Sequence, residues 1–165
     1  MKNFAQIFVI LLVVSLVSWP HSPVIAANEP GVQLGSLVCK SLPGTRVQFF
    51  LKTSVAIKCT LKNLNGQERY KGEIGLLGID LSKKSEETLN FTVDGIAGNI
   101  KMGSHSLSGE YVGASISASI IKEGIGTTQF VGGLDKGFNL VPSLDTFKGT
   151  GISAGVSRMK LVADK

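Results

Sequence analysis

The amino-acid sequence predicts an all-β domain: a small antiparallel β-barrel, or alternatively a β-sandwich, with about 8–9 strands and an N-terminal signal peptide. Three observations predict this fold class. Apolar and polar residues alternate with a period of two in several segments, which is typical of half-buried antiparallel strands. Turn signals recur at short intervals, and no long window has a convincing helical period. Closure of such a sheet is favoured because it removes exposed strand edges.

The first element is an export signal over residues 1–26. Lys2 supplies a short basic region, Phe8–Val17 is a largely apolar run too short for a comfortable transmembrane helix, and Ala26/Ala27 is the expected cleavage position. An uncleaved membrane anchor is the alternative. Residues 27–31 are expected to be a flexible N-terminus, and residues 32–163 a single all-β domain. The signal predicts Sec-type export to the periplasm, with release from the cell as the alternative.

The strands are expected where alternation is clearest, between turn signals. Asn65-Gly66 lies between two alternating segments and is a strong hairpin signal. The polar segment Ser82–Glu87 is expected to be a connection, with at most one helical turn. The resulting strands are 32–39, 46–52, 54–62, 68–77, 88–95, 109–121, 127–131, 137–141 and 152–162.

Residues 109–121, GEYVGASISASII, form the strand whose two faces differ most. One face carries only aliphatic side chains and the other is mostly Gly and Ser. A membrane-spanning barrel would place the aliphatic face toward lipid, but the chain lacks the aromatic girdles of such barrels. We therefore expect the aliphatic side chains to point into the core of a soluble domain, facing large residues such as Phe49 and Phe91 or a ligand cavity. These side chains are Val112, Ala114, Ile116, Ala118 and Ile120.

Cys39 and Cys59 are the only two cysteines, and they follow an export signal. An even number of cysteines in an exported chain predicts a disulfide bond. Closing a loop of this length would contribute roughly 3 kcal/mol. Two buried free thiols are the alternative. A metal site is not expected, because this spacing with one remaining His matches no standard ligand pattern.

The sequence offers no convergent catalytic set. Ser153 lies in a G-x-S-x-G match, Gly151–Gly155, but within a predicted strand and with no His after it, so a small residue on a sheet face is expected. His105 lies in a polar loop and has no evident partner. We therefore expect a protein that is not an enzyme and that uses no cofactor and no catalytic metal.

The chain has a moderate basic excess. Its net charge is +5, and removal of residues 1–26 takes away only Lys2, which leaves +4. Lys58 and Lys62 are expected on the outer face of one strand, in a region that also contains Arg46 and Lys52. Such a surface could meet anionic envelope material, or its lysines could simply protect a strand edge. Nucleic acid is not an expected partner, because no aromatic platform accompanies the basic residues.

The mature chain resembles the DUF992 family, small exported proteins of unknown function found mostly in alphaproteobacteria. The matching stretches lie between about Gly31 and Leu161; among them are Gly35–Cys39, Cys59–Leu61, Glu68–Gly72, Leu107–Ser115 and Leu140–Pro142. The best match is the start of the 109–121 strand, with Gly109, Tyr111, Gly113 and Ser115. The resemblance supports the fold, export and the cysteine pair, and it implies no activity.

These observations lead to three functional hypotheses. The first is a non-enzymatic periplasmic or envelope protein that acts through contact with a protein partner or envelope components, without spanning the membrane after cleavage. The second is a carrier that holds a small apolar ligand or lipid inside the barrel. The third is a secreted factor that acts outside the cell. A hollow apolar interior would distinguish the carrier, because a packed core has no room for a lipid.

Overall fold

The computed structural model describes residues 32–95, 100–121, 123–132 and 137–165, and in these residues nine strands form one antiparallel sheet. The predicted signal peptide, its cleavage position and the expected flexible segment 27–31 lie outside the described residues. The strands are β1 (Val32–Ser41), β2 (Val47–Phe49), β3 (Lys52–Asn63), β4 (Gly66–Asp80), β5 (Lys83–Gly95), β6 (Gly109–Ile121), β7 (Glu123–Gly132), β8 (Asn139–Pro142) and β9 (Asp145–Ala163).

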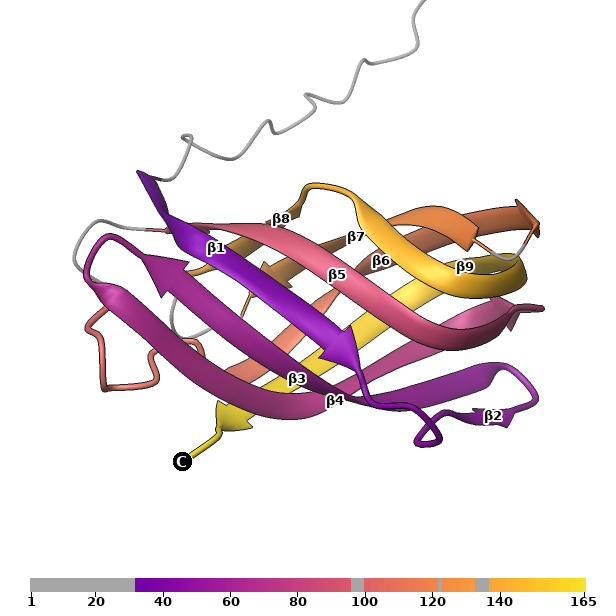
Figure 1. Cartoon of the computed structure of the whole chain (residues 1–165), viewed down its shortest axis with the longest axis horizontal. Coiled ribbons are helices and arrows are strands. Elements are labelled where there is room, and N and C mark those ends of the chain that lie inside the picture. Colours follow the sequence, from indigo (N-terminus) through magenta and orange to yellow (C-terminus); the bar gives the residue numbers. More distant parts are fainter. Residues whose placement is uncertain (1–31, 96–99, 122, 133–136) are drawn as a thin grey trace, which may run out of the picture.

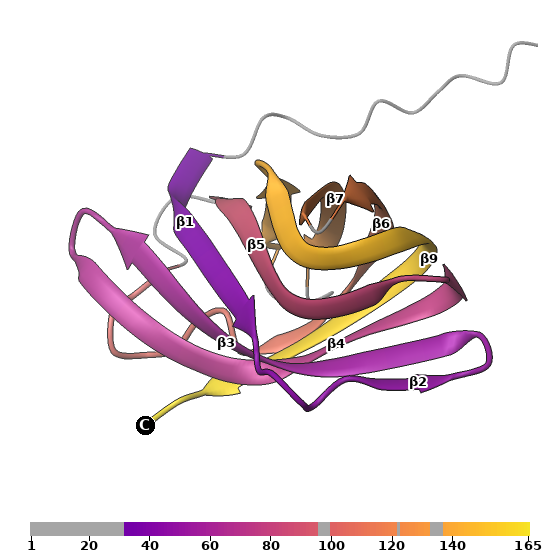
Figure 2. The ribbon, with the colours of Figure 1, turned by 45° about the vertical axis from the view of Figure 1, so that its right-hand side comes forward.

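The sheet curls into a ring (Figures 1 and 2). Its strand order is β1-β5-β8-β7-β6-β9-β4-β3-β2, and β1 also pairs with β3, which brings the two ends of the order together. The prediction of an antiparallel all-β fold with about 8–9 strands is therefore confirmed. The strands belong to one ring-like sheet and not to two stacked sheets.

The long strand β9 pairs with different strands along its length. Its first residues pair with β5 and β7, and its later residues pair with β4 and β6. Between these parts lies Gly151, whose φ of 110° is unfavourable for other residues. A Cβ at Gly151 would also lie 2.3 Å from the carbonyl oxygen of Leu81. Glycine is therefore required where β9 bends past the end of β4.

Cys39 and Cys59 form a disulfide bond that joins β1 to β3. The two residues are direct register partners, and both are buried. The bond therefore lies at the seam where the first and last parts of the ring meet.

A hydrophobic core fills one half of the interior. It packs inward-pointing side chains from several strands, including Phe91 on β5 and Phe130 on β7, whose ring centroids are 5.8 Å apart. Phe91 therefore lies in the core as expected. Phe49, by contrast, is 79% exposed, because the short strand β2 lies beyond β3 at the edge of the sheet.

The expectation for the faces of residues 109–121 was wrong. Val112 and Ile116 are 49% and 60% exposed, and Ala114 and Ala118 are also exposed. The Gly/Ser face points inward, with Tyr111 and Ser117 buried. An aliphatic face that points outward is the orientation expected of a sheet that faces lipid. The side chain of Ile120 lies outside the described residues.

The expectation of a connection over residues 82–87 was also wrong. Residues from Lys83 onward belong to β5, which pairs with β9 through a register shift between Lys84 and Glu86. Within this segment Lys83 and Glu86 are exposed, whereas the side chains of Lys84 and Glu87 are only 6% and 13% exposed. Lys84 and Glu87 point into the ring, where they form ion pairs.

Candidate functional site

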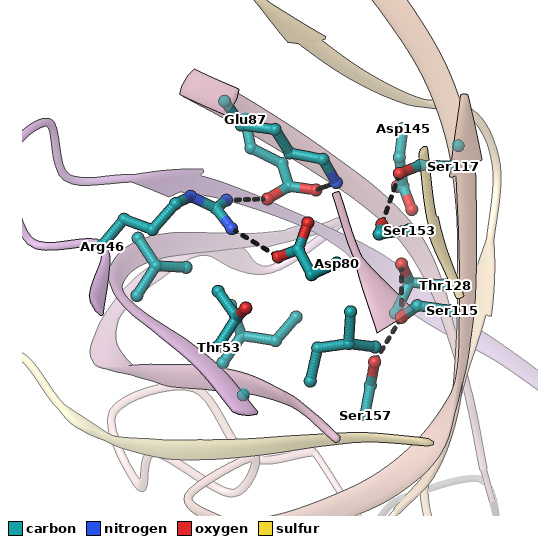
Figure 3. A pocket seen from close by; sticks show the side chains of 16 residues that line it. Arg46, Thr53, Asp80, Glu87, Ser115, Ser117, Thr128, Asp145, Ser153 and Ser157 are labelled. Carbon is teal, nitrogen blue, oxygen red and sulfur yellow. Dashed lines mark hydrogen bonds and ion pairs between the residues drawn. The ribbon is translucent and has the colours of Figure 1, made fainter. Parts of the chain in front are cut away.

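The second half of the interior contains a polar cavity with a volume of about 40 Å³ (Figure 3). Its walls come from β3, β4, β5, β6, β7 and β9, and from Arg46, which lies just before β2. A space of this size accommodates a few water molecules, whereas sites for drug-sized ligands measure roughly 300–1,000 Å³. The side chains that line it with hydroxyl or charged groups are Arg46, Thr53, Asp80, Lys84, Glu87, Ser115, Ser117, Thr128, Asp145, Ser153 and Ser157.

One wall of the polar cavity is a network of hydroxyl groups from three neighbouring strands. Ser115 on β6 donates to Thr128 on β7 over 3.0 Å, and it also shares a hydrogen bond with Ser157 on β9. Ser117 and Ser153 are register partners on β6 and β9, with their Oγ atoms 2.7 Å apart. Cross-strand pairing satisfies these buried hydroxyls, and this is why the Ser-rich face of β6 can point inward.

A charged cluster occupies the opposite side of the cavity. The guanidinium group of Arg46 lies 2.8 Å from Glu87 Oε2 and 3.6 Å from Asp80 Oδ2, and Lys84 Nζ lies 2.8 Å from the other oxygen of Glu87. Lys84 also lies 4.5 Å above the ring of Phe147. Arg46 therefore does not belong to an outer basic surface, as the sequence suggested, because the cluster neutralises its charge.

The electrostatics of Asp80 follow from its partners. Burial acts to raise the pKa of this carboxyl group, but hydrogen bonds from Ser82 and Thr53 and the charge of Arg46 outweigh burial. The pKa therefore lies below its ordinary value. Asp80 remains ionised as the acceptor that holds Arg46 at the end of β4.

Asp145 is the acid of the cavity that forms no ion pair with another described residue. Its Oδ1 accepts a hydrogen bond from the backbone N–H of Asn90 at 3.1 Å, while Oδ2 has no partner among the described residues. Burial raises the pKa of Asp145 to about 6, against the effects of hydrogen bonds from Asn90 and Thr128. The cavity therefore contains one group that takes up or releases a proton in a mildly acidic range.

The far end of the ring is closed by a loop that precedes β6. Glu68 is buried and accepts hydrogen bonds from Tyr70 Oη at 2.5 Å and from the backbone N–H groups of Gly103 and His105. Tyr111 Oη donates to the carbonyl oxygen of Leu107 over 2.8 Å. Burial is the main cause that raises the pKa of both tyrosines, so they stay protonated donors. These contacts fix the loop and close the core.

The residues singled out in the sequence occupy separate regions. His105 contacts the ring of Tyr70, with centroids 5.5 Å apart, whereas Ser153 pairs with Asp80 at the other end of β4. Ten residues of strand separate these positions, roughly 30 Å at the usual rise per residue. His105 and Ser153 therefore cannot act on one substrate atom.

The four residues of the best family match lie on one strand with different surroundings. Gly109 begins β6, Tyr111 lies in the core, and Gly113 follows it on the inner side. Ser115 lies in the cavity wall. Sequence reasoning noticed the Gly/Ser face of this strand but missed its partners Thr128 and Ser157. The alternation of Ser153 and Ser157 with exposed aliphatic residues on β9 was the signal that these strands share an inner polar face.

An exposed hydrophobic surface covers the outside of the same wall. We call it the apolar outer face. Register partners connect its side chains across the strands: Leu77 lies opposite Val156, which lies opposite Ala114, and Ile152 lies opposite Ala118, which lies opposite Ile125. Its members are Leu77, Ile79, Leu81, Val112, Ala114, Ile116, Ala118, Ile125, Ile152, Ala154 and Val156.

The outer surface at β1 and β3 is largely polar by contrast. The outward-pointing residues of β1 and β3 include Ser36, Lys40, Lys58 and Lys62, all exposed. Lys58 and Lys62 therefore lie on the outer face, as expected. Since the same alternation produces a polar exterior on one side and an apolar exterior on the other, an apolar outer face is not a requirement of the fold.

The described residues include no helix that is long and apolar enough to cross a bilayer. Nor do they bring together three or more His, Cys, Asp or Glu side chains in an arrangement that could hold a metal ion.

Comparison with known proteins identifies a family for almost the whole domain. Residues 21–162 match the model of DUF992, described as a protein of unknown function. Searches of the curated proteins and of the solved structures gave no match to the chain. Because the family model covers most of the chain, from before β1 to the penultimate residue of β9, the chain belongs to the DUF992 family.

Proposed function

We propose that this protein is an exported, non-enzymatic protein of the bacterial envelope that binds the surface of a lipid membrane from the periplasmic side. The observation that carries the proposal is the apolar outer face. Large contiguous apolar patches are rare on monomeric soluble proteins, and where they occur they commonly mark interaction sites. Here side chains such as Ile116 and Ile152 are 60% and 54% exposed although the same strands bury small polar residues.

Charge supports lipid as the occupant of this face. Lys52 lies opposite Leu77, and Arg158 lies opposite Val112, at the margins of the face. Neither cation forms an ion pair with another described residue. Free cations at the margin of an apolar surface are suited to anionic headgroups, to which a nearby Lys or Arg contributes about 1 kcal/mol.

The chemistry of the face also supports lipid over a specific protein partner. Its members are Leu, Ile, Val and Ala, and the centre of the face carries no aromatic, Arg or Met side chain of the kinds enriched in protein interfaces. The backbone polar groups of the four strands are already paired within the sheet. Such a surface gains from burial in hydrocarbon without leaving hydrogen-bonding groups unsatisfied.

The interior supports a non-enzymatic role. The hydroxyl groups of Ser117 and Ser153 bond to each other, and His105 lies at the other end of the ring. The polar lining and small volume of the cavity do not favour the alternative of a carrier for an apolar ligand.

The test is flotation of the exported protein with vesicles of phosphatidylethanolamine and phosphatidylglycerol. The double variant Ile116→Ser/Ile152→Ser should reduce vesicle binding at least about tenfold, since burying each whole side chain contributes roughly 1.5–3 kcal/mol. The matched control is Leu64→Ser/Val162→Ser, which changes exposed apolar residues outside the apolar outer face. The control should bind like the wild type, and its binding should weaken with salt.

Two results would overturn the proposal. One is a wild-type protein that fails to float with these vesicles. The other is a dimer in light scattering that the Ile116→Ser/Ile152→Ser variant converts to monomer, with no vesicle binding by either form. The second result would assign the apolar outer face to another copy of the chain.

A further inference from the structure

The turn between β2 and β3 exposes three consecutive large apolar residues. Phe49, Phe50 and Leu51 are 79%, 94% and 51% exposed, and we call them the hairpin tip. Phe50 has a φ of 49°, in the left-handed region that non-glycine residues rarely adopt. A polar or glycine residue would suit this turn better, so the fold itself does not explain two aromatic rings at this position.

The hairpin tip is held in place by the end of β4. The side-chain amide of Gln48 donates to the carbonyl oxygens of Asp80 and Ser82, over 3.3 and 3.2 Å. The N–H of Gly78 donates to the carbonyl oxygen of Leu51 over 2.9 Å. Figure 2 shows the hairpin projecting at one end of the ring. The exposed rings are therefore presented by a fixed scaffold.

The hairpin tip is continuous with the apolar outer face. Lys52 follows the tip directly and is the register partner of Leu77, which belongs to that face. An apolar tip next to a lysine fits the boundary of a bilayer, since the rings enter hydrocarbon while the ammonium group stays with the phosphates.

We propose that the hairpin tip inserts into the bilayer and anchors the protein on it, an inference that rests on the proposed membrane binding. Insertion fixes the orientation of the molecule, because Phe49 and Phe50 lie at one end of the ring. It also brings the charged end of the polar cavity close to the headgroups, since Arg46 lies next to β2.

Tryptophan fluorescence tests insertion directly, because the only tryptophan of the chain, Trp19, lies in the leader that cleavage after Ala26 is expected to remove. In the exported protein, the variant Phe50→Trp places a reporter at the hairpin tip, and Leu64→Trp places a matched reporter at the β3–β4 turn, where Leu64 is fully exposed. With vesicles of phosphatidylethanolamine and phosphatidylglycerol, the reporter at position 50 should shift to the blue and be quenched by brominated lipid chains. The reporter at position 64 should show neither effect.

A second variant measures how much the tip contributes to binding. Phe49→Ser/Phe50→Ser should fold normally by circular dichroism and reduce vesicle flotation at least tenfold. If wild-type protein floats but the reporter at position 50 is not quenched, insertion is wrong while membrane binding stands. Quenching of both reporters would also overturn the inference, since it would indicate adsorption without a defined orientation. No flotation by any variant would overturn the proposed function itself.

Discussion

Asp145 is a buried carboxyl group whose surroundings disfavour its ionised form. It is 2% exposed, its Oδ2 has no partner among the described residues, and the charge of Glu87, which itself binds Arg46 and Lys84, also raises the pKa of Asp145. Withdrawal from bulk solvent makes the ionised form of such a carboxyl group unfavourable. The folded protein therefore prefers Asp145 in its protonated form until the pH approaches 6.

The substitution Asp145→Asn tests the raised pKa of Asp145 through the pH dependence of the free energy of unfolding. The pKa is raised from 3.8 to about 6 in the folded protein, so the stabilisation from proton binding is complete below pH 3.8 and is lost as the pH rises to 6. Asparagine cannot ionise and loses nothing. The free energy of unfolding of the variant minus that of the wild type should therefore increase by about 2–3 kcal/mol from pH 4 to pH 7.

Urea denaturation of both proteins at several pH values between 4 and 7.5 measures that difference. Other carboxylates titrate in both proteins, so they cancel in the comparison. A difference that stays constant over this range would mean that Asp145 is not protonated preferentially in the folded state.

Some residue positions could be predicted from the sequence, and others could not. The core position of Phe91 and the outward lysines Lys58 and Lys62 followed from alternation alone. The contact between Arg46 and Glu87 did not, because it joins residues 41 positions apart through the closure of the ring. The charged half of the candidate site therefore could not be predicted from local patterns.

At the scale of elements, alternation located the strands but not their inner faces. A period of two is the same whichever face is buried. The apolar face of β6 was assigned to the core by its hydropathy. In the ring, Ser115 and Ser117 instead find hydroxyl partners on β7 and β9, so burying them costs little. The inner face depended on cross-strand pairs, which no single segment displays.

The Cys39–Cys59 bond is the element-scale feature that holds the ring closed. Removing it in Cys39→Ala/Cys59→Ala should lower the free energy of unfolding by about 3 kcal/mol, since the unfolded chain regains the freedom of a 20-residue loop. Denaturant titration under oxidising conditions measures the loss. Wild-type protein with dithiothreitol should unfold near the midpoint of the variant, and an unchanged midpoint in both cases would show that the β1–β3 pairing needs no covalent support.

At the scale of the whole molecule, the ring separates polar and apolar character in an unusual way. One half of the interior is a hydrophobic core and the other half a polar cavity, while the exterior over that cavity is apolar. Small inward residues on β6 and β9 leave room for the cavity, and the larger aliphatic residues of the same strands point outward. The membrane surface that we propose would cover the side of the molecule where core-like residues are exposed.

Native mass spectrometry of the exported chain provides the last prediction. We expect a monomer that begins at Ala27, after cleavage between Ala26 and Ala27, and whose mass is lower by two hydrogens because Cys39 and Cys59 are bonded. No lipid should be retained inside the ring, because the described cavity is polar and measures about 40 Å³. In cell fractionation, the protein should be recovered with the membranes, on their periplasmic side. A lipid adduct that survives the Ile116→Ser/Ile152→Ser substitution would instead support an internal carrier site, and a chain that retains residues 1–26 would show that the leader itself anchors the protein.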